Sequence, residues 1–97
     1  MEIVFEIKDK TGRKIHLSKE RWNHIVAKHP DMADKLDEIK QALIQPAMIV
    51  QHKYDDTMRN YCRYYKNERC YLLVSVKYLN GEGYVATAFF TRKVIRR

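Results

Sequence analysis

The sequence predicts an α+β fold in which two N-terminal helices pack on a curved four-stranded antiparallel sheet, with a short N-terminal hairpin. Three observations support it. Six short segments have the composition or alternation of strands, and two segments between the second and third strands repeat apolar residues with helical spacing. Prolines and turn-forming residues stand at the boundaries. Because 97 residues suit one core, residues 1–97 are expected to form one domain.

The predicted hairpin comes first. Residues 2–7 are rich in apolar, strand-favouring side chains, and residues 14–17 can return antiparallel to them. The turn between these strands runs from Asp9 to Gly12, two residue types that favour turns.

Both helices have recognisable ends. Ser18 is a good N-cap for the first helix, which runs to about Lys28 because Pro30 cannot continue the helical hydrogen-bond ladder. Asp31 is expected to cap the second helix, and Pro46 ends it. One stripe of the second helix is expected to face the core: Met32, Leu36, Ile39 and Leu43.

Four strands follow the helices, at residues 47–53, 59–66, 70–79 and 83–93, with turns at residues 66–69 and 80–83. The register of the last hairpin depends on its turn. A three-residue loop pairs Ser75 with Thr87 and puts them, with Lys77, on the face away from the helices. A two-residue turn at Asn80 and Gly81 shifts the register by one and separates Ser75 from Thr87. Polar side chains in mid-strand indicate a face that is exposed or contacts something polar.

Charge points to the class of partner. The net charge is +7, and residues 51–97 carry 10 basic against 4 acidic side chains together with all seven tyrosines. A basic, tyrosine-rich half favours an anionic partner with flat faces, RNA or DNA. The alternative is a lysine-rich soluble surface with tyrosines in the core.

Several classes of protein are disfavoured. No apolar run approaches the roughly 18 residues that span a bilayer, and the first residues do not resemble a signal peptide, so a cytoplasmic protein is expected. His24 and His29 are five residues apart, which does not suit a shared metal ion on a helix, and no metal or other cofactor is expected. Cys62 and Cys70 lie in strand segments that offer no means of activating a thiol.

Two patterns suggest RNA chemistry. Arg59, Tyr61, Arg63 and Tyr65 alternate along one strand and would offer phosphate-binding forks and stacking planes on one face. An amphipathic strand with exposed arginines is the alternative. His29 lies within the apolar stripe of the first helix, so packing and catalysis both remain open for it. His24 lies beyond that stripe, where a solvated histidine is the simpler interpretation, and His16 and His52 have no assigned role.

The motifs together resemble a known group. Residues 15–25 and 28–32 are similar to the opening motif of small phage, bacterial and archaeal domains of the BECR superfamily, which includes barnase, EndoU, colicin-type and RelE-type ribonucleases. Residues 46–49, 63–65, 74–77 and 86–91 resemble the same domains in the same order. The resemblance covers roughly residues 15–95 and is most specific in its N-terminal part.

The resemblance implies a metal-independent endoribonuclease. The matching catalytic positions are His24, His29, Arg63, Lys77, Thr87 and Thr91, and the substrate-binding candidates are Arg59, Tyr61, Tyr65 and Ser75. An imidazole titrates near neutral pH and can act as base or acid, cations can hold the phosphate, and hydroxyls can bond a nonbridging oxygen. The expected product ends in a 2′,3′-cyclic phosphate.

The expected partner is RNA, and an acidic inhibitor protein could cover the basic face if the enzyme is a toxin. A non-catalytic RNA-binding module and a protein-interaction domain are the competing interpretations.

Overall fold

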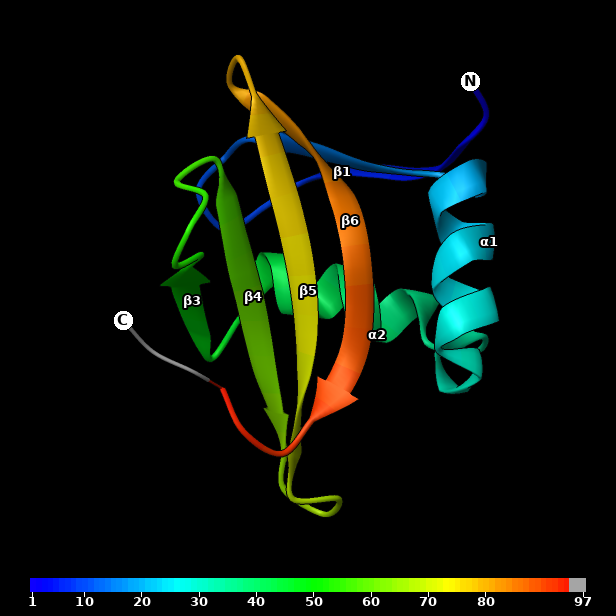
Figure 1. The fold of residues 1–97 in the computed structure, drawn as a ribbon, viewed down its shortest axis with the longest axis vertical. Helices are drawn as coiled ribbons and strands as arrows, with labels where there is room; N and C mark the ends of the chain where they lie inside the picture. The colour runs from blue at the N-terminus through cyan, green and yellow to red at the C-terminus, as the bar shows by residue number, and fades with distance from the viewer. Residues whose placement is uncertain (95–97) are drawn as a thin grey trace.

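The elements follow the predicted order along the chain, β-β-α-α-β-β-β-β (Figure 1). The computed structural model describes residues 1–94, and the last three residues of the predicted domain lie outside the described residues. The elements are β1 (Ile3–Lys8), β2 (Lys14–Ser18), α1 (Lys19–Lys28), a short 3-10 helix η1 (Pro30–Met32), α2 (Leu36–Ile44), β3 (Met48–Gln51), β4 (Met58–Tyr65), β5 (Cys70–Leu79) and β6 (Glu82–Thr91). Among residues 1–94, no helix has the length and apolar character needed to span a membrane.

The sheet corrects the predicted architecture. All six strands form one mixed sheet in the order β1-β2-β6-β5-β4-β3, so the prediction of a four-stranded antiparallel sheet is wrong. Strand β2 pairs with β6 in parallel, with Lys14 opposite Glu82 and His16 opposite Tyr84. The N-terminal hairpin thus satisfies backbone groups at the edge of β6 instead of standing apart. The strands of the predicted hairpin, which precede the helices, are therefore part of the main sheet.

The two helices occupy different positions around the sheet. Figure 1 shows α2 crossing behind β4, β5 and β6, while α1 stands beside β6. Strand β2 ends at Ser18, whose side chain accepts from the Arg21 N–H at 3.2 Å, which confirms the predicted N-cap. Since β2 runs parallel to β6, helix α1 continues along the part of β6 that β2 does not pair.

The second helix begins later than predicted. Asp31 is not its cap, because Pro30 starts the short η1 turn and α2 begins only at Leu36. The apolar stripe is confirmed for α2, since Ile39 and Leu43 are fully buried and Leu36 packs against the core. Met32 is also fully buried, but it lies in η1 and not in α2. The core therefore lies between α2 and one face of the sheet.

The β5–β6 hairpin contains both alternatives considered for its register. Asn80 and Gly81 have φ of 51° and 86°, the left-handed values of a two-residue hairpin turn. Lys77 consequently lies opposite Tyr84, and not opposite Val85 as the three-residue loop predicted. A bulge follows, and beyond it Ser75 lies opposite Thr87 as that loop predicted.

The bulge determines which side chains share a surface. We call the sheet surface opposite α2 the outer face. Along β5, Ser75 and Lys77 alternate with the fully buried Val74 and Val76, so their side chains belong to the outer face. Their cross-strand partners Thr87 and Tyr84, and then Phe89 and Thr91 farther along β6, lie on the same face. Without the extra residue, positions 84 and 87 would face opposite sides.

Candidate functional site

The outer face has a polar centre where β5 meets β6. Ser75 is buried at 5% exposure, and its partner Thr87 is partly exposed above the middle of the face. Lys77 lies two residues from Ser75 on β5, and Phe89 lies two residues from Thr87 on β6. Each step is roughly 7 Å along a strand. The Ser75–Thr87 pair therefore lies midway between a cation and an aromatic ring.

His29 reaches this face from the end of α1. As the C-cap residue, it donates its backbone N–H to the Ile25 carbonyl at 2.7 Å, which fixes its position at the helix end. Its imidazole stacks on the ring of Phe89, with ring centroids 5.3 Å apart and planes inclined by 28°. The ring is partly buried. An imidazole thus lies beside the strand that carries Thr87.

His24 is placed differently. It is exposed on α1 and lines a shallow surface pocket with Glu20, Arg21 and Asn23. His24 and His29 are both candidate catalytic residues from the sequence, and of these two His29 is the one that contacts Phe89.

Lys77 is held by a carboxylate. Its ammonium lies 2.8 Å from Asp55 Oδ2, in a loop that joins β3 to β4, and 28% of the lysine side chain is exposed. The other carboxylate oxygen accepts from the Thr57 N–H and hydroxyl, so the loop holds the carboxylate in place. The hydrogen bond from Lys77, together with those from Thr57, holds the pKa of Asp55 well below its usual range. The Lys77 ammonium is therefore positioned and partly neutralised by an ionised partner.

A third group on the outer face had no predicted role. The guanidinium of Arg21 lies 5.7 Å from the centroid of the Tyr84 ring, and the His16 ring lies 6.2 Å from it. The position of His16 could have been inferred, because it stands between the buried Ile15 and Leu17 and must face the opposite side. The parallel pairing that brings it to Tyr84 has no comparable signal in the sequence.

The four-residue row on β4 lies on the other side of the sheet. Arg59, Tyr61, Arg63 and Tyr65 share one face as predicted, but they lie opposite Val76, Val74, Leu72 and Cys70, on the side that α2 covers. Tyr61 is fully buried, and Arg63 donates to the Gln45 carbonyl at the end of α2. Arg59 lies over the ring of Tyr78. The row is therefore not part of the outer face.

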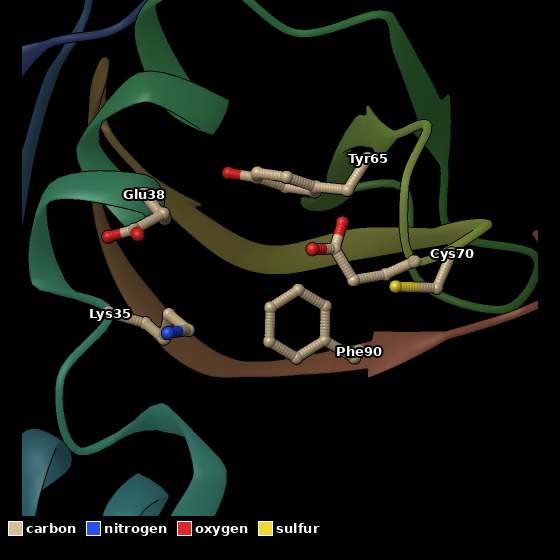
Figure 2. Close-up of a pocket in the computed structure, with 6 residues that line it drawn as sticks. Lys35, Glu38, Tyr65, Cys70 and Phe90 are labelled. Atoms are coloured by element: carbon tan, nitrogen blue, oxygen red, sulfur yellow. The ribbon is translucent and has the colours of Figure 1, made fainter.

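Tyr65 lines a pocket on this helix-covered side (Figure 2). Its ring and that of Phe90 meet nearly edge to face, while Lys35 and Glu38 come from the start of α2. Burial, and then the negative charge of Glu38, raises the pKa of Tyr65. The pocket has mixed charge and is separated from the outer face by the sheet.

Thr91 is at the end of β6 on the outer face. Its hydroxyl donates to the Lys93 carbonyl at 2.9 Å, and it also lies close to the Lys93 N–H. These contacts stabilise the turn that follows the strand. Thr91 is thus beyond Phe89, at the opposite end of the face from Tyr84.

The outer face brings together an imidazole, an ammonium group and hydroxyls. These groups can move a proton and stabilise negative charge on a phosphate. Within residues 1–94, no three His, Cys, Asp or Glu side chains gather as a set of metal ligands. Of the predicted site residues, His29, Ser75, Lys77, Thr87 and Thr91 share this region, whereas Arg59, Tyr61, Arg63 and Tyr65 do not.

The comparison with protein families confirms the resemblance. Neither the curated proteins nor the solved structures contain a significant match to this sequence. Residues 2–97 match the family PBECR2, described as phage-Barnase-EndoU-ColicinE5/D-RelE like nuclease2. This match extends over nearly the whole chain and supports a nuclease-type function. The chain belongs to the PBECR2 family of barnase-, EndoU-, colicin- and RelE-like nucleases.

Proposed function

We propose that the protein is a metal-independent endoribonuclease whose active site lies on the outer face along β6. The observation that carries the proposal is the stacking of His29 on Phe89, two residues from Thr87 on the same strand face. A phosphate over Thr87 would lie between His29 on one side and Lys77 on the other.

Each group has a role in this scheme. His29 accepts the proton of the ribose 2′-hydroxyl as the 2′-oxygen attacks phosphorus. Lys77 stabilises the negative charge that develops on the phosphoryl oxygens, and the Thr87 hydroxyl donates to one of them. The bond from phosphorus to the 5′-oxygen then breaks, and the leaving oxygen takes a proton from the Lys77 ammonium or from water. The products are a 2′,3′-cyclic phosphate and a 5′-hydroxyl.

The remaining outer-face residues support these three. Ser75 is buried beneath the site and packs next to Thr87, so it helps to position the Thr87 hydroxyl and the strand backbone. Thr91 stabilises the end of β6 through Lys93. Neither needs to contact the reacting atoms.

RNA digestion with analysis of the product ends tests the proposal. The purified protein should cut end-labelled single-stranded RNA in excess EDTA and leave 2′,3′-cyclic phosphate ends. It should leave a DNA strand of the same sequence intact, because DNA lacks the 2′-hydroxyl nucleophile. Cleavage that requires an added divalent ion, or that proceeds equally on DNA, would contradict it.

The proposal extends to a toxin that acts on cytoplasmic RNA and is neutralised by an acidic protein. The net charge of +7 favours a partner whose carboxylates take the place of RNA phosphates on the outer face. Expression of the wild-type chain should then slow growth, and His29→Ala should relieve the effect at the same protein level. Equal toxicity of the two proteins would contradict this extension.

A further inference from the structure

Tyr84, Arg21 and His16 form a group on the outer face that has no role in the proposed cleavage reaction. The Tyr84 ring is partly exposed, with the Arg21 guanidinium 5.7 Å from its centroid and the His16 ring 6.2 Å away. Arg21 itself is exposed on α1. Because a cation–π contact of an exposed side chain is only weakly stabilising, the Arg21 guanidinium can move aside at little cost.

The group lies next to the proposed phosphate position. Tyr84 is directly opposite Lys77 across the two strands, which places their Cβ atoms about 5 Å apart. Thr87 lies three residues farther along β6, at most roughly 10 Å away. A nucleotide bound through its phosphate at Lys77 and Thr87 would therefore have a neighbouring base within reach of the Tyr84 ring.

Helix α1 forms a wall along this path. Its first turn places Arg21 beside Tyr84, and its end places His29 beside Phe89. The helix and β6 thus run side by side in the same direction, with a cation and an imidazole at the two ends. A single strand of RNA lying along β6 would meet Tyr84 at one end and His29 at the other.

The chemistry of the three side chains suits a nucleobase. An aromatic ring offers a stacking surface, a guanidinium offers a second plane and a phosphate-binding fork, and an imidazole can bond a base edge. We propose that Tyr84, with Arg21 and His16, is a stacking subsite for the nucleobase that flanks the scissile phosphate. The proposal rests on the proposed ribonuclease function and adds three residues that position the bound RNA strand.

Binding of uncleavable RNA tests the subsite. Short single-stranded 2′-O-methyl RNA lacks the nucleophile, so its affinity does not depend on catalysis. One base at a time is removed to leave an abasic sugar, and binding is measured to the wild type, Tyr84→Leu and Tyr84→Phe. Leucine keeps apolar bulk against the neighbouring side chains but removes the stacking plane, and phenylalanine keeps that plane. Thermal unfolding checks that both variants fold.

The expected result is coupling between Tyr84 and one base position. Removal of that base should weaken wild-type binding about five- to 150-fold, the range measured for single stacked bases. The Tyr84→Leu protein should bind the intact RNA more weakly by a similar factor. Removal of the same base should not weaken the binding of this variant further. Tyr84→Phe should bind like the wild type. If removal of a base weakens binding to the Tyr84→Leu protein by the same factor as binding to the wild type, at every base position, the subsite proposal is overturned.

Cleavage of ordinary RNA, measured beside binding, separates the two proposals. Cleavage without coupling at Tyr84 overturns the subsite and leaves the ribonuclease function standing. Coupling without cleavage supports the subsite and contradicts the catalytic proposal. If the wild type has no measurable affinity for the strand, the subsite is overturned.

Discussion

The hydroxyl of Tyr78 donates to the Asp9 carboxylate at 2.6 Å, joining two residues 69 positions apart in the sequence. The Tyr61 hydroxyl donates to the same carboxylate oxygen at 2.8 Å. The other oxygen accepts from the backbone N–H groups of Thr11 and Arg13. Because both carboxylate oxygens already accept hydrogen bonds, a proton on either oxygen would displace a donor, so the network favours the ionised carboxylate. This buried network fixes the turn after β1 to the middle of the sheet.

The network predicts a loss of stability in acid. Burial alone would raise the pKa of Asp9, but hydrogen bonds from Thr11, Tyr78 and Tyr61 outweigh it and lower the pKa below its usual value. A lowered folded-state pKa stabilises the protein above the ordinary carboxyl pKa of about 3.9. This contribution is lost as the pH falls from there through the lowered value.

Asp9→Asn is therefore expected to lower the free energy of unfolding at neutral pH by about 1–3 kcal/mol, and to flatten its decline below about pH 4. Urea unfolding at a series of pH values measures both effects. Asp31→Asn, at an exposed carboxyl on η1, is the matched control. This variant should show the same decline in the free energy of unfolding below about pH 4 as the wild type. An Asp9→Asn protein with the wild-type pH dependence would show that the network does not cause it.

The two histidines of the α1 region are expected to differ sharply. His29→Ala should reduce the cleavage rate by about 10²- to 10⁴-fold, the usual contribution of a positioned acid or base. His24→Ala should leave the rate within about threefold, because His24 is exposed on α1 away from Phe89. Rates under single-turnover conditions on one RNA measure both. A larger loss for His24→Ala than for His29→Ala would assign the catalytic imidazole to the other position.

Asp55 is expected to restrain RNA binding by neutralising Lys77. Asp55→Asn should tighten binding of uncleavable RNA at low salt by about two- to fivefold, which corresponds to the free energy of one ion pair near the surface. This gain in affinity should vanish at high salt. Asparagine can still accept from Thr57, so the loop keeps its shape. Asp56→Asn removes the same charge one residue away and is the control. If both variants gain equally, the effect is one of net charge and not of Lys77.

The sequence predicted the elements better than their arrangement. Ser18, Pro30 and the apolar stripe of α2 act locally, so the positions of the helices could be recognised from the chain. The parallel pairing of β2 with β6 joins residues nearly 70 positions apart, and no local pattern in His16 or Tyr84 indicates it. The bulge before Thr87 is also not marked by a turn residue, yet it decides that Thr87 shares a face with Tyr84.

The faces on which the candidate site residues lie could also be predicted only in part. Alternation placed Arg59, Tyr61, Arg63 and Tyr65 on one face, but the face that α2 covers depends on tertiary packing and cannot be inferred from a single strand. For Ser75 and Thr87 the inference was sounder, because polar side chains in mid-strand rarely face an apolar core.

The face that α2 covers gives the last prediction, which concerns Arg63. Its guanidinium donates to the Gln45 carbonyl at 2.6 Å, satisfying a backbone acceptor just beyond α2. Arg63→Gln should therefore lower the free energy of unfolding by about 1 kcal/mol and leave RNA cleavage within about twofold of the wild type. Lys77→Gln removes the same charge from the outer face and should instead reduce cleavage at least tenfold with a smaller change in stability. Denaturant unfolding and single-turnover cleavage of both variants measure this contrast. If Arg63→Gln abolishes cleavage in a folded protein, the catalytic cation lies on the helix-covered face and the outer-face site is incorrect.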